Sequence, residues 1–232
     1  HEVEVVDDTP GFAQRSGFVF LGAMVDDDTP NGDSVRWFVR EVWPLVRSRL
    51  GPTATLHLVG ACEAPSVRRL ASPDVQVHGR VESPAPHMDS ARVFIVPTRY
   101  AAGIPHKAHE AAARGLPMVV TPLIAAQLGW QDIVAVGGDA GSFAGHCIQL
   151  HEDAQAWQQQ RDAILTAVAR DGSPATFRAA VERLLGTEAR STLRQAADAV
   201  TDTPSPLALG MDEQRTADLW GRDAAQRAAG EA

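Results

Sequence analysis

The chain has 232 residues, of which 44% are hydrophobic, and a formal net charge of -8 at pH 7. This length suits the core of one ordinary domain with a helical appendage, rather than two full domains. The acidic balance argues against a nucleic-acid or anionic-membrane partner, because such partners require a basic surface. No apolar stretch is long enough to cross a bilayer, and the N-terminus lacks the features of a signal peptide. Only two cysteines occur, Cys62 and Cys147, so we expect free thiols and a cytoplasmic location.

Short apolar runs alternate with amphipathic stretches, a pattern typical of parallel strands covered by helices. The predicted strands are residues 18–22, 55–60, 75–79, 93–97, 117–121 and 133–137. The predicted helices are residues 33–50 and segments around 66–70, 85–91, 106–114 and 142–151. Together they predict an α/β fold with a single doubly wound, Rossmann-like parallel sheet of about six strands, in the order 3-2-1-4-5-6. The stretch after the first strand, LGAMVDDDTPNG, lacks the G-x-G-x-x-G motif, which disfavours an NAD-linked dehydrogenase.

After about Glu152 the pattern becomes helical, first over residues 154–170 and then over 173–185, where Ser173 is a plausible N-cap. From Gly186 onward few large apolar residues remain. We therefore expect a helical C-terminal extension, with a helical or partly disordered tail at residues 187–232 that carries no chemistry.

The only lysine of the chain, Lys107, follows the predicted fourth strand and a glycine-bearing loop. Pro105 is predicted to start a helix that runs to Arg114, with Gly115 as its left-handed terminator. In a sheet of order 3-2-1-4-5-6, the carboxyl ends of strands one and four open the crevice where ligands bind. We therefore expect Lys107 to lie in that crevice, at the start of a helix.

A helix N-terminus and an ammonium group both favour a phosphate. Gly103 lets the backbone approach a ligand closely, and Glu110, nearly one turn after Lys107, can accept hydrogen bonds from sugar hydroxyls. This arrangement fits a nucleoside diphosphate. On an arbitrary helix, however, Lys107 and Glu110 would simply be a surface ion pair.

The stretch RYAAGIPHKAHEAAARGLPMVVTP, residues 99–122, resembles the donor-site motif of the group 1 (family 4) retaining glycosyltransferases of the GT-B fold. The resemblance covers about residues 17–185, because FVFLG, ATLHLVG and VQVHGRVES are similar to that family's first three strands. It implies the C-terminal, donor-binding domain of such an enzyme.

The resemblance implies a role for particular residues of this sequence. It places the diphosphate-binding lysine on Lys107. Arg99 is a second local cation in the same stretch of this sequence, and we expect both residues to be catalytic. It places the ribose-binding glutamate on Glu110. The remaining donor-binding positions that it implies are Gly22 near the diphosphate, Gly79, Arg80 and Val81 in the base-binding loop, and the loop amides of Ala102, Gly103 and Ile104.

No cofactor and no metal ion are expected to be required; the donor substrate would be a nucleoside-diphosphate sugar. His106 and His109 lie three residues apart without a third ligand nearby in the sequence, which disfavours a metal site. Arg99 has a competing interpretation as a structural contact to its own loop.

The sequence departs from the family pattern in two places. Many members have a second glutamate eight positions before the ribose-binding one, where this chain has Ala102. The acidic run Asp26 to Asp28 follows the first strand, where other members place basic residues on the phosphates. The run most often forms a solvated loop.

We expect the donor-nucleotide half of a retaining glycosyltransferase, which transfers a sugar from a nucleoside-diphosphate sugar to an acceptor hydroxyl. The N-terminal acceptor-binding domain is expected to be missing from this chain, which begins at His1. Residues 1–16 are predicted to link domains and residues 17–186 to bind the nucleotide sugar. The alternative is a catalytically degenerate module with an assembly or regulatory role, favoured by Ala102, by the acidic loop and by the tail.

Overall fold

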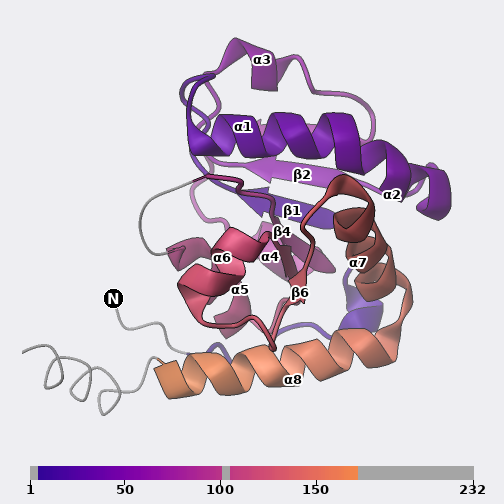
Figure 1. Cartoon of the computed structure of the whole chain (residues 1–232), viewed down its shortest axis with the longest axis vertical. Helices are drawn as coiled ribbons and strands as arrows, with labels where there is room; N and C mark the ends of the chain where they lie inside the picture. Colours follow the sequence, from indigo (N-terminus) through magenta and orange to yellow (C-terminus); the bar gives the residue numbers. More distant parts are fainter. Residues whose placement is uncertain (1–4, 101–104, 172–232) are drawn as a thin grey trace, which may run out of the picture. The chain divides into compact units, whose positions relative to one another are not determined.

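The computed structural model describes residues 5–100 and 105–171, all within one compact unit. Its sheet has six parallel strands in the order β3-β2-β1-β4-β5-β6, which confirms the predicted topology (Figure 1). The strands are β1 (Phe18–Leu21), β2 (Leu56–Val59), β3 (Val75–Gly79), β4 (Val93–Val96), β5 (Met118–Val120) and β6 (Ala135–Val136). β1 lies between β2 and β4, so the chain reverses its direction of travel across the sheet at these central strands. Their carboxyl ends form the crevice expected of such a topology.

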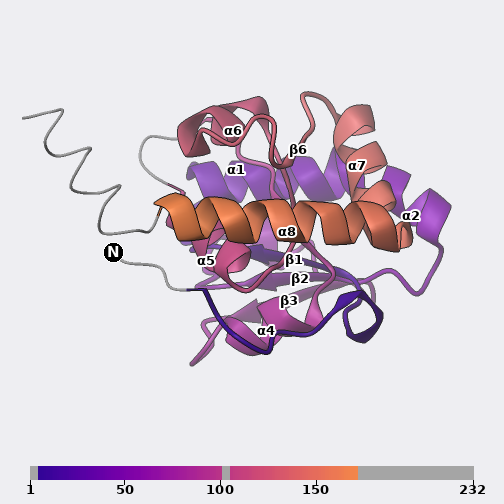
Figure 2. The same ribbon diagram turned by 90° about the horizontal axis from the view of Figure 1, so that it is seen from below.

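Helices cover both faces of the sheet (Figure 2). The helical elements are η1 (Phe12–Gln14), α1 (Pro30–Trp37), η2 (Phe38–Val42), α2 (Trp43–Leu50), α3 (Pro65–Arg68), α4 (Ala85–Ser90), α5 (His106–Ala113), α6 (Pro122–Leu128), α7 (Ala140–Glu152) and α8 (Ala154–Asp171). One core joins α1, η2, α2 and α7 to the sheet face that carries Phe18 and Phe20. A second core joins α4, α5, α6 and α8 to the opposite face, which carries Val19 and Phe94. The alternation of successive strand residues between the two cores follows from the period of a β-strand.

The first predicted helix begins earlier than expected and contains a π-helical turn. Pro30 is its first residue, and the Thr29 side chain accepts a hydrogen bond from the Gly32 amide as an N-cap. The π-helical turn, η2, ends immediately before Trp43 and Pro44. Since proline has no N–H and clashes with the preceding turn, Pro44 accounts for the local widening of the helix.

Helix α6 was not among the predicted helices. Thr121 caps it by accepting from the Ile124 amide, Pro122 is its first residue, and Gly129 ends it with a φ of 68°. The Thr-Pro start and the glycine end were signals in the sequence, but a helix of 7 residues shows too little periodicity to stand out. The predicted helix at 173–185 and the tail at 187–232 lie outside the described residues.

The segment that precedes β1 packs on the domain through Arg15. Its buried guanidinium donates hydrogen bonds to the backbone carbonyls of Pro10, Met88, Ala91 and Arg114. Arg161 of α8 also donates to the carbonyl of Pro10. No helix among residues 5–100 and 105–171 is long and apolar enough to cross a membrane.

Candidate functional site

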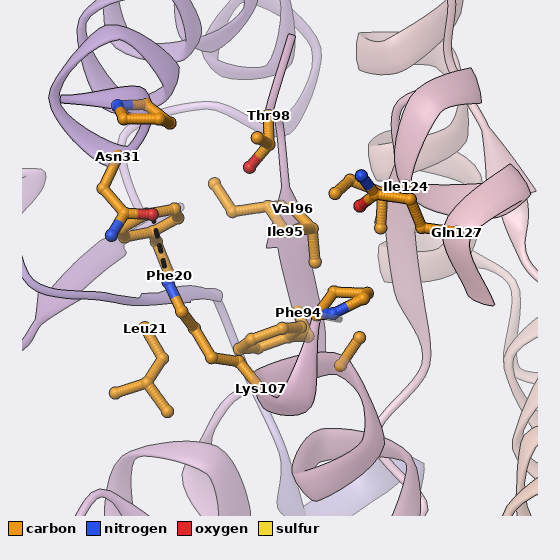
Figure 3. Close-up of a pocket in the computed structure, with 13 residues that line it drawn as sticks. Phe20, Leu21, Asn31, Phe94, Ile95, Val96, Thr98, Lys107, Ile124 and Gln127 are labelled. Carbon is orange, nitrogen blue, oxygen red and sulfur yellow. Dashed lines mark hydrogen bonds between the residues drawn. The ribbon is translucent and has the colours of Figure 1, made fainter. Parts of the chain in front are cut away.

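Lys107 lies in the crevice between the carboxyl ends of β1 and β4. It is in the first turn of α5, which follows β4, and its Nζ donates a hydrogen bond of 3.0 Å to Oδ1 of Asn31 in the first turn of α1 (Figure 3). The ammonium also lies 5.4 Å from the centre of the Phe20 ring. A Cβ atom at Gly22, directly after β1, would lie only 2.6 Å from Nζ. Glycine at this position therefore leaves the space that the ammonium occupies.

A cavity of about 240 Å³ opens beside this amine. Asn31, Thr98, Lys107 and Gln127 supply its polar side chains, and the rest of its lining is apolar: Phe20, Leu21, Pro30, Phe94, Ile95, Val96, Pro105, Ala108 and Ile124. Residues from the first turns of both α1 and α5 line the cavity, so two helix N-termini face it. Helix N-termini present backbone amides and a positive dipole end, which attract anions.

The pKa of Lys107 is lowered to about 8, because burial penalises the charged ammonium; Glu110 opposes this effect. The ammonium form still predominates at pH 7. A desolvated cation beside a cavity gains more from an anionic ligand than a solvated one does, because the local dielectric is low. The amine is therefore suited to pair with a phosphate group.

Glu110 lies one turn further along α5 and is exposed. Its charge acts on Lys107, but no side-chain hydrogen bond joins the two residues in the described part of the chain. The carboxylate is free to accept hydrogen bonds from a ligand at the mouth of the crevice. The structure thus brings Lys107 and Glu110 close together, as the sequence analysis expected, without their forming a tight ion pair.

Residues 15–153 match the model of the family described as "Glycosyl transferases group 1". The chain belongs to this family of glycosyltransferases. A search among curated proteins finds no significant match.

Several solved structures share the fold of this glycosyltransferase domain. TarM is 12% identical in sequence to this chain, with a TM-score of 0.59, and the match covers 78% of this chain and 36% of TarM. Anabaena Alr3699/HepE, solved in complex with UDP and glucose, is 15% identical with a TM-score of 0.56, and the match covers 75% of this chain and 49% of HepE. A glycosyltransferase from Rickettsia africae is 11% identical with a TM-score of 0.56, and the match covers 81% of this chain and 49% of that protein. The chain spans less than half the length of each of these proteins.

Arg99 of the glycosyltransferase domain points away from the cavity. Its Nε donates a hydrogen bond of 3.0 Å to Asp33 of α1, its Nη2 pairs with the same carboxylate, and it lies over the Trp37 ring at 5.6 Å. The hydrogen bond to Asp33 raises the pKa of Arg99, so its charge is compensated within the protein. In this arrangement Lys107 is the cation beside the cavity, and Arg99 braces the loop after β4 against α1.

The expected base-binding residues lie at the carboxyl end of β3, on the same edge of the sheet but outside the cavity lining. Gly79 has a φ of 71°, and its carbonyl accepts a hydrogen bond from Gly60, which follows β2. Arg80 is exposed, and Val81 packs against the second core. Ala102, Gly103 and Ile104 lie outside the described residues.

The acidic loop after β1 is tied to α3. Asp27 accepts hydrogen bonds from the backbone amide and the hydroxyl of Ser66, which lower its pKa, and Arg36 lies 3.7 Å from the same carboxylate. This carboxylate is therefore engaged by its own loop and by the adjacent helices. Its contacts account for an acidic residue near an expected phosphate site.

Three residues of the site were not among the predicted ones: Asn31, Thr98 and Phe20. Asn31 was detectable, because Thr29 and Pro30 are a helix-start signal that places it in the first turn facing the crevice. Thr98 joins the site through tertiary contacts, since its carbonyl accepts from the Thr121 hydroxyl and its hydroxyl lies 3.3 Å from that of Ser34. No local pattern in the sequence indicates such contacts.

Proposed function

We propose that this chain is the donor-nucleotide half of a retaining glycosyltransferase, which binds a nucleoside-diphosphate sugar in the crevice between β1 and β4. The observation that carries the proposal is the position of the Lys107 ammonium. It is partly buried, it donates a hydrogen bond to Asn31, and it lies beside a cavity lined by the first turns of two helices. Membership of the group 1 family supports it. The complex of HepE with UDP and glucose shows a structural neighbour of this fold with such ligands.

In this reaction the bond between the anomeric carbon and the diphosphate breaks, and negative charge develops on the departing oxygen. Lys107, which is partly buried, and the first-turn amides of α5 would stabilise that charge, since the fold already holds them in place. The cavity of about 240 Å³ is smaller than the roughly 300–1,000 Å³ usual for drug-sized ligands, so it fits the diphosphate region and not a whole donor. The ribose would lie at the mouth of the crevice, within reach of Glu110.

The acceptor would be held by a second domain. The structural neighbours are more than twice as long as the part of them that this chain covers, which leaves room for such a domain. Orientation of two reactants supplies about 7–11 kcal/mol of a barrier in well-positioned systems. We therefore expect residues 1–232 to bind a donor without transferring its sugar to an acceptor.

Calorimetric titration of the chain with UDP, GDP and ADP tests donor binding. At least one of the three should give a saturable isotherm, with the matching nucleoside binding more weakly because it lacks the diphosphate. The absence of binding by all three at millimolar concentration would overturn the proposal in favour of a degenerate module. Acceptor-dependent transfer by residues 1–232 alone would contradict the need for a second domain.

We further propose a cytoplasmic location. Cys62 and Cys147 are both buried free thiols, and burial raises the pKa of each, so neither is suited to form a disulfide. A disulfide involving either cysteine in protein isolated from its native source would contradict this location.

A further inference from the structure

A cluster of three histidines lies at the β3 side of the sheet, away from the cavity beside Lys107. His57 is in β2, His78 in β3 and His87 in α4, three elements that lie together in Figure 2. One ring nitrogen from each histidine lies within 4.8 Å of those from the other two. Among the described residues, these three histidines are the group of His, Cys, Asp or Glu side chains whose ligand atoms lie close enough together to hold one metal ion.

The pleat and the pairing of the strands bring the cluster together. His57 pairs with Gln76 in register, so Gln76 and His78, two residues apart in β3, share the sheet face of His57. The pairing shifts by one residue at this point, because Leu58 pairs with Val77 but Val59 pairs with Gly79. Such bulges redirect side chains at sheet edges. Helix α4 covers this face through Met88 and presents His87 to the same place.

The three rings face one another with few internal hydrogen bonds. Nδ1 of His57 and Nε2 of His78 are 2.9 Å apart, and the His78 and His87 rings have centroids 4.4 Å apart. Burial, followed by the neighbouring histidines, lowers the pKa of His57, and burial followed by His87 lowers the pKa of His78. A neutral imidazole carries a lone pair on one ring nitrogen, and this is the form of histidine that binds metal ions.

The distances suit a tetrahedral ion. Zinc–nitrogen bonds of about 2.0–2.1 Å place the ligand nitrogens of a tetrahedral site roughly 3.3 Å apart. One pair is already closer than this, at 2.9 Å, and every pair is within 4.8 Å. Small rotations of the exposed His78 ring and the half-buried His57 and His87 rings would bring the nitrogens to the required separation.

We propose that His57, His78 and His87 bind one divalent transition-metal ion of the zinc type, with a fourth position open to solvent beside His78. Imidazole ligands select zinc, copper, cobalt or nickel over magnesium and calcium, which prefer oxygen. The ion would link β2, the edge strand β3 and α4. The proposal is independent of donor binding, because none of the three histidines lines the cavity beside Lys107.

The test is a calorimetric titration of chelator-treated protein, without a histidine tag, with Zn²⁺ and with Mg²⁺. One Zn²⁺ per chain should bind and Mg²⁺ should not, and Co²⁺ in the same site should give the visible absorption bands of tetrahedral coordination. His78→Gln and His87→Gln should each weaken Zn²⁺ binding by at least about tenfold, since loss of even an outer partner of a ligand costs about 10–100-fold.

His146→Gln is the matched control, because His146 lies on α7, outside the cluster. Its Zn²⁺ affinity should equal that of the unmodified chain. Zn²⁺ should also raise the Tm of the unmodified chain and of His146→Gln, but not that of His78→Gln. The proposal is overturned if no Zn²⁺ binds, or if binding survives unchanged in both His78→Gln and His87→Gln. His78 is exposed at the sheet edge, so its replacement should leave the fold intact, as circular dichroism would verify.

Discussion

Arg15 and Lys107 are both cations that the fold withdraws from water, but the groups around them differ, and the difference distinguishes a structural cation from a functional one. Arg15 is buried and directs its guanidinium at four backbone carbonyls, with Asp89 at 3.9 Å. Lys107 makes one side-chain hydrogen bond within the described residues, to Asn31, and stands beside a cavity. Burial lowers the pKa of both groups, Arg15 to about 10 and Lys107 to about 8.

The difference lies in how the cost of burying a charge is offset. The donors of Arg15 are matched by carbonyls of the N-terminal segment, α4 and the end of α5, so its interactions belong to the folded domain itself. Among the described residues, the Lys107 ammonium donates one side-chain hydrogen bond, to Asn31, and none to a carboxylate. Its other N–H groups and its charge are therefore available to a ligand. A partly buried cation that the protein leaves incompletely matched is a candidate for ligand binding.

The largest expected effect is that of Arg15→Met on stability. The substitution leaves the carbonyls of Met88 and Ala91 buried without their donor, so the free energy of unfolding should fall by about 3–5 kcal/mol. Urea denaturation followed by circular dichroism measures this change. A loss below about 1 kcal/mol would show that Arg15 is dispensable to the fold.

Lys107→Met should have the opposite effect on stability while it weakens ligand binding. Removing a desolvated ammonium, whose pKa is lowered to about 8, should raise the free energy of unfolding by up to about 3 kcal/mol. The affinity for a nucleoside diphosphate should fall by about 10–100-fold, and that for the nucleoside should not change.

Lys107→Arg is the matched control, because it keeps the charge but replaces a compact ammonium with a planar fork. It should recover only part of the affinity that Lys107→Met loses. Equal losses for nucleoside and nucleoside diphosphate in Lys107→Met would mean that Lys107 does not contact phosphate.

Glu110→Ala tests the other end of the proposed ligand. If its carboxylate accepts hydrogen bonds from both ribose hydroxyls, its loss should weaken nucleoside and nucleoside diphosphate alike, by about 10–100-fold. The Tm should change little, because Glu110 is exposed. An unchanged affinity in the folded variant would remove Glu110 from the site.

Diphosphate affinity should depend on pH through Lys107. The ammonium of the free domain is lost as the pH rises through about 8, so affinity should be constant from pH 7 to just below 8 and then decline, by at most about tenfold per pH unit. Titration calorimetry from pH 7 to 9.5 measures the profile. The decline should be absent in Lys107→Met, and a profile shared by both proteins would assign it to another group.

The smallest expected effect is that of Gly22→Ala. The added methyl group would lie 2.6 Å from Nζ of Lys107 and 3.1 Å from the Asn31 side chain, so the ammonium has to move. Diphosphate affinity should fall by about threefold to tenfold. Gly138→Ala is the control, because its Cβ would meet its nearest neighbour, Pro122, at an ordinary 3.9 Å. Equal affinities for the two variants would mean that the position of the ammonium is not critical.

The sequence was sufficient to predict the sheet, because each strand is a short apolar run and the order of such runs in a doubly wound fold is restricted. It also predicted that Lys107 lies at the crevice, since that position depends only on which strand precedes it. It could not predict that Asn31 would be the partner of Lys107, or that Arg99 would turn to Asp33, because these contacts join segments 66 to 76 residues apart.

The histidine cluster is a clearer example of contacts that the sequence could not predict. The spacing of His57, His78 and His87 in the sequence resembles no known metal motif, whereas His106 and His109 are only three residues apart. The cluster exists because β2 and β3 pair in one particular register and α4 crosses the same face. His109 packs edge-on against the Trp130 ring at 5.1 Å, which suits a structural role.

The single lysine of this sequence also makes the domain a chemical reporter of its own occupancy. An amine whose pKa is lowered to about 8 is substantially unprotonated under mildly alkaline conditions, where ordinary lysines are not. An amine-directed acylating reagent therefore finds a single side-chain amine in the sequence, and it lies beside the cavity. A ligand that pairs with that ammonium both occludes it and keeps it protonated, so the extent of labelling reports directly on whether the crevice is filled.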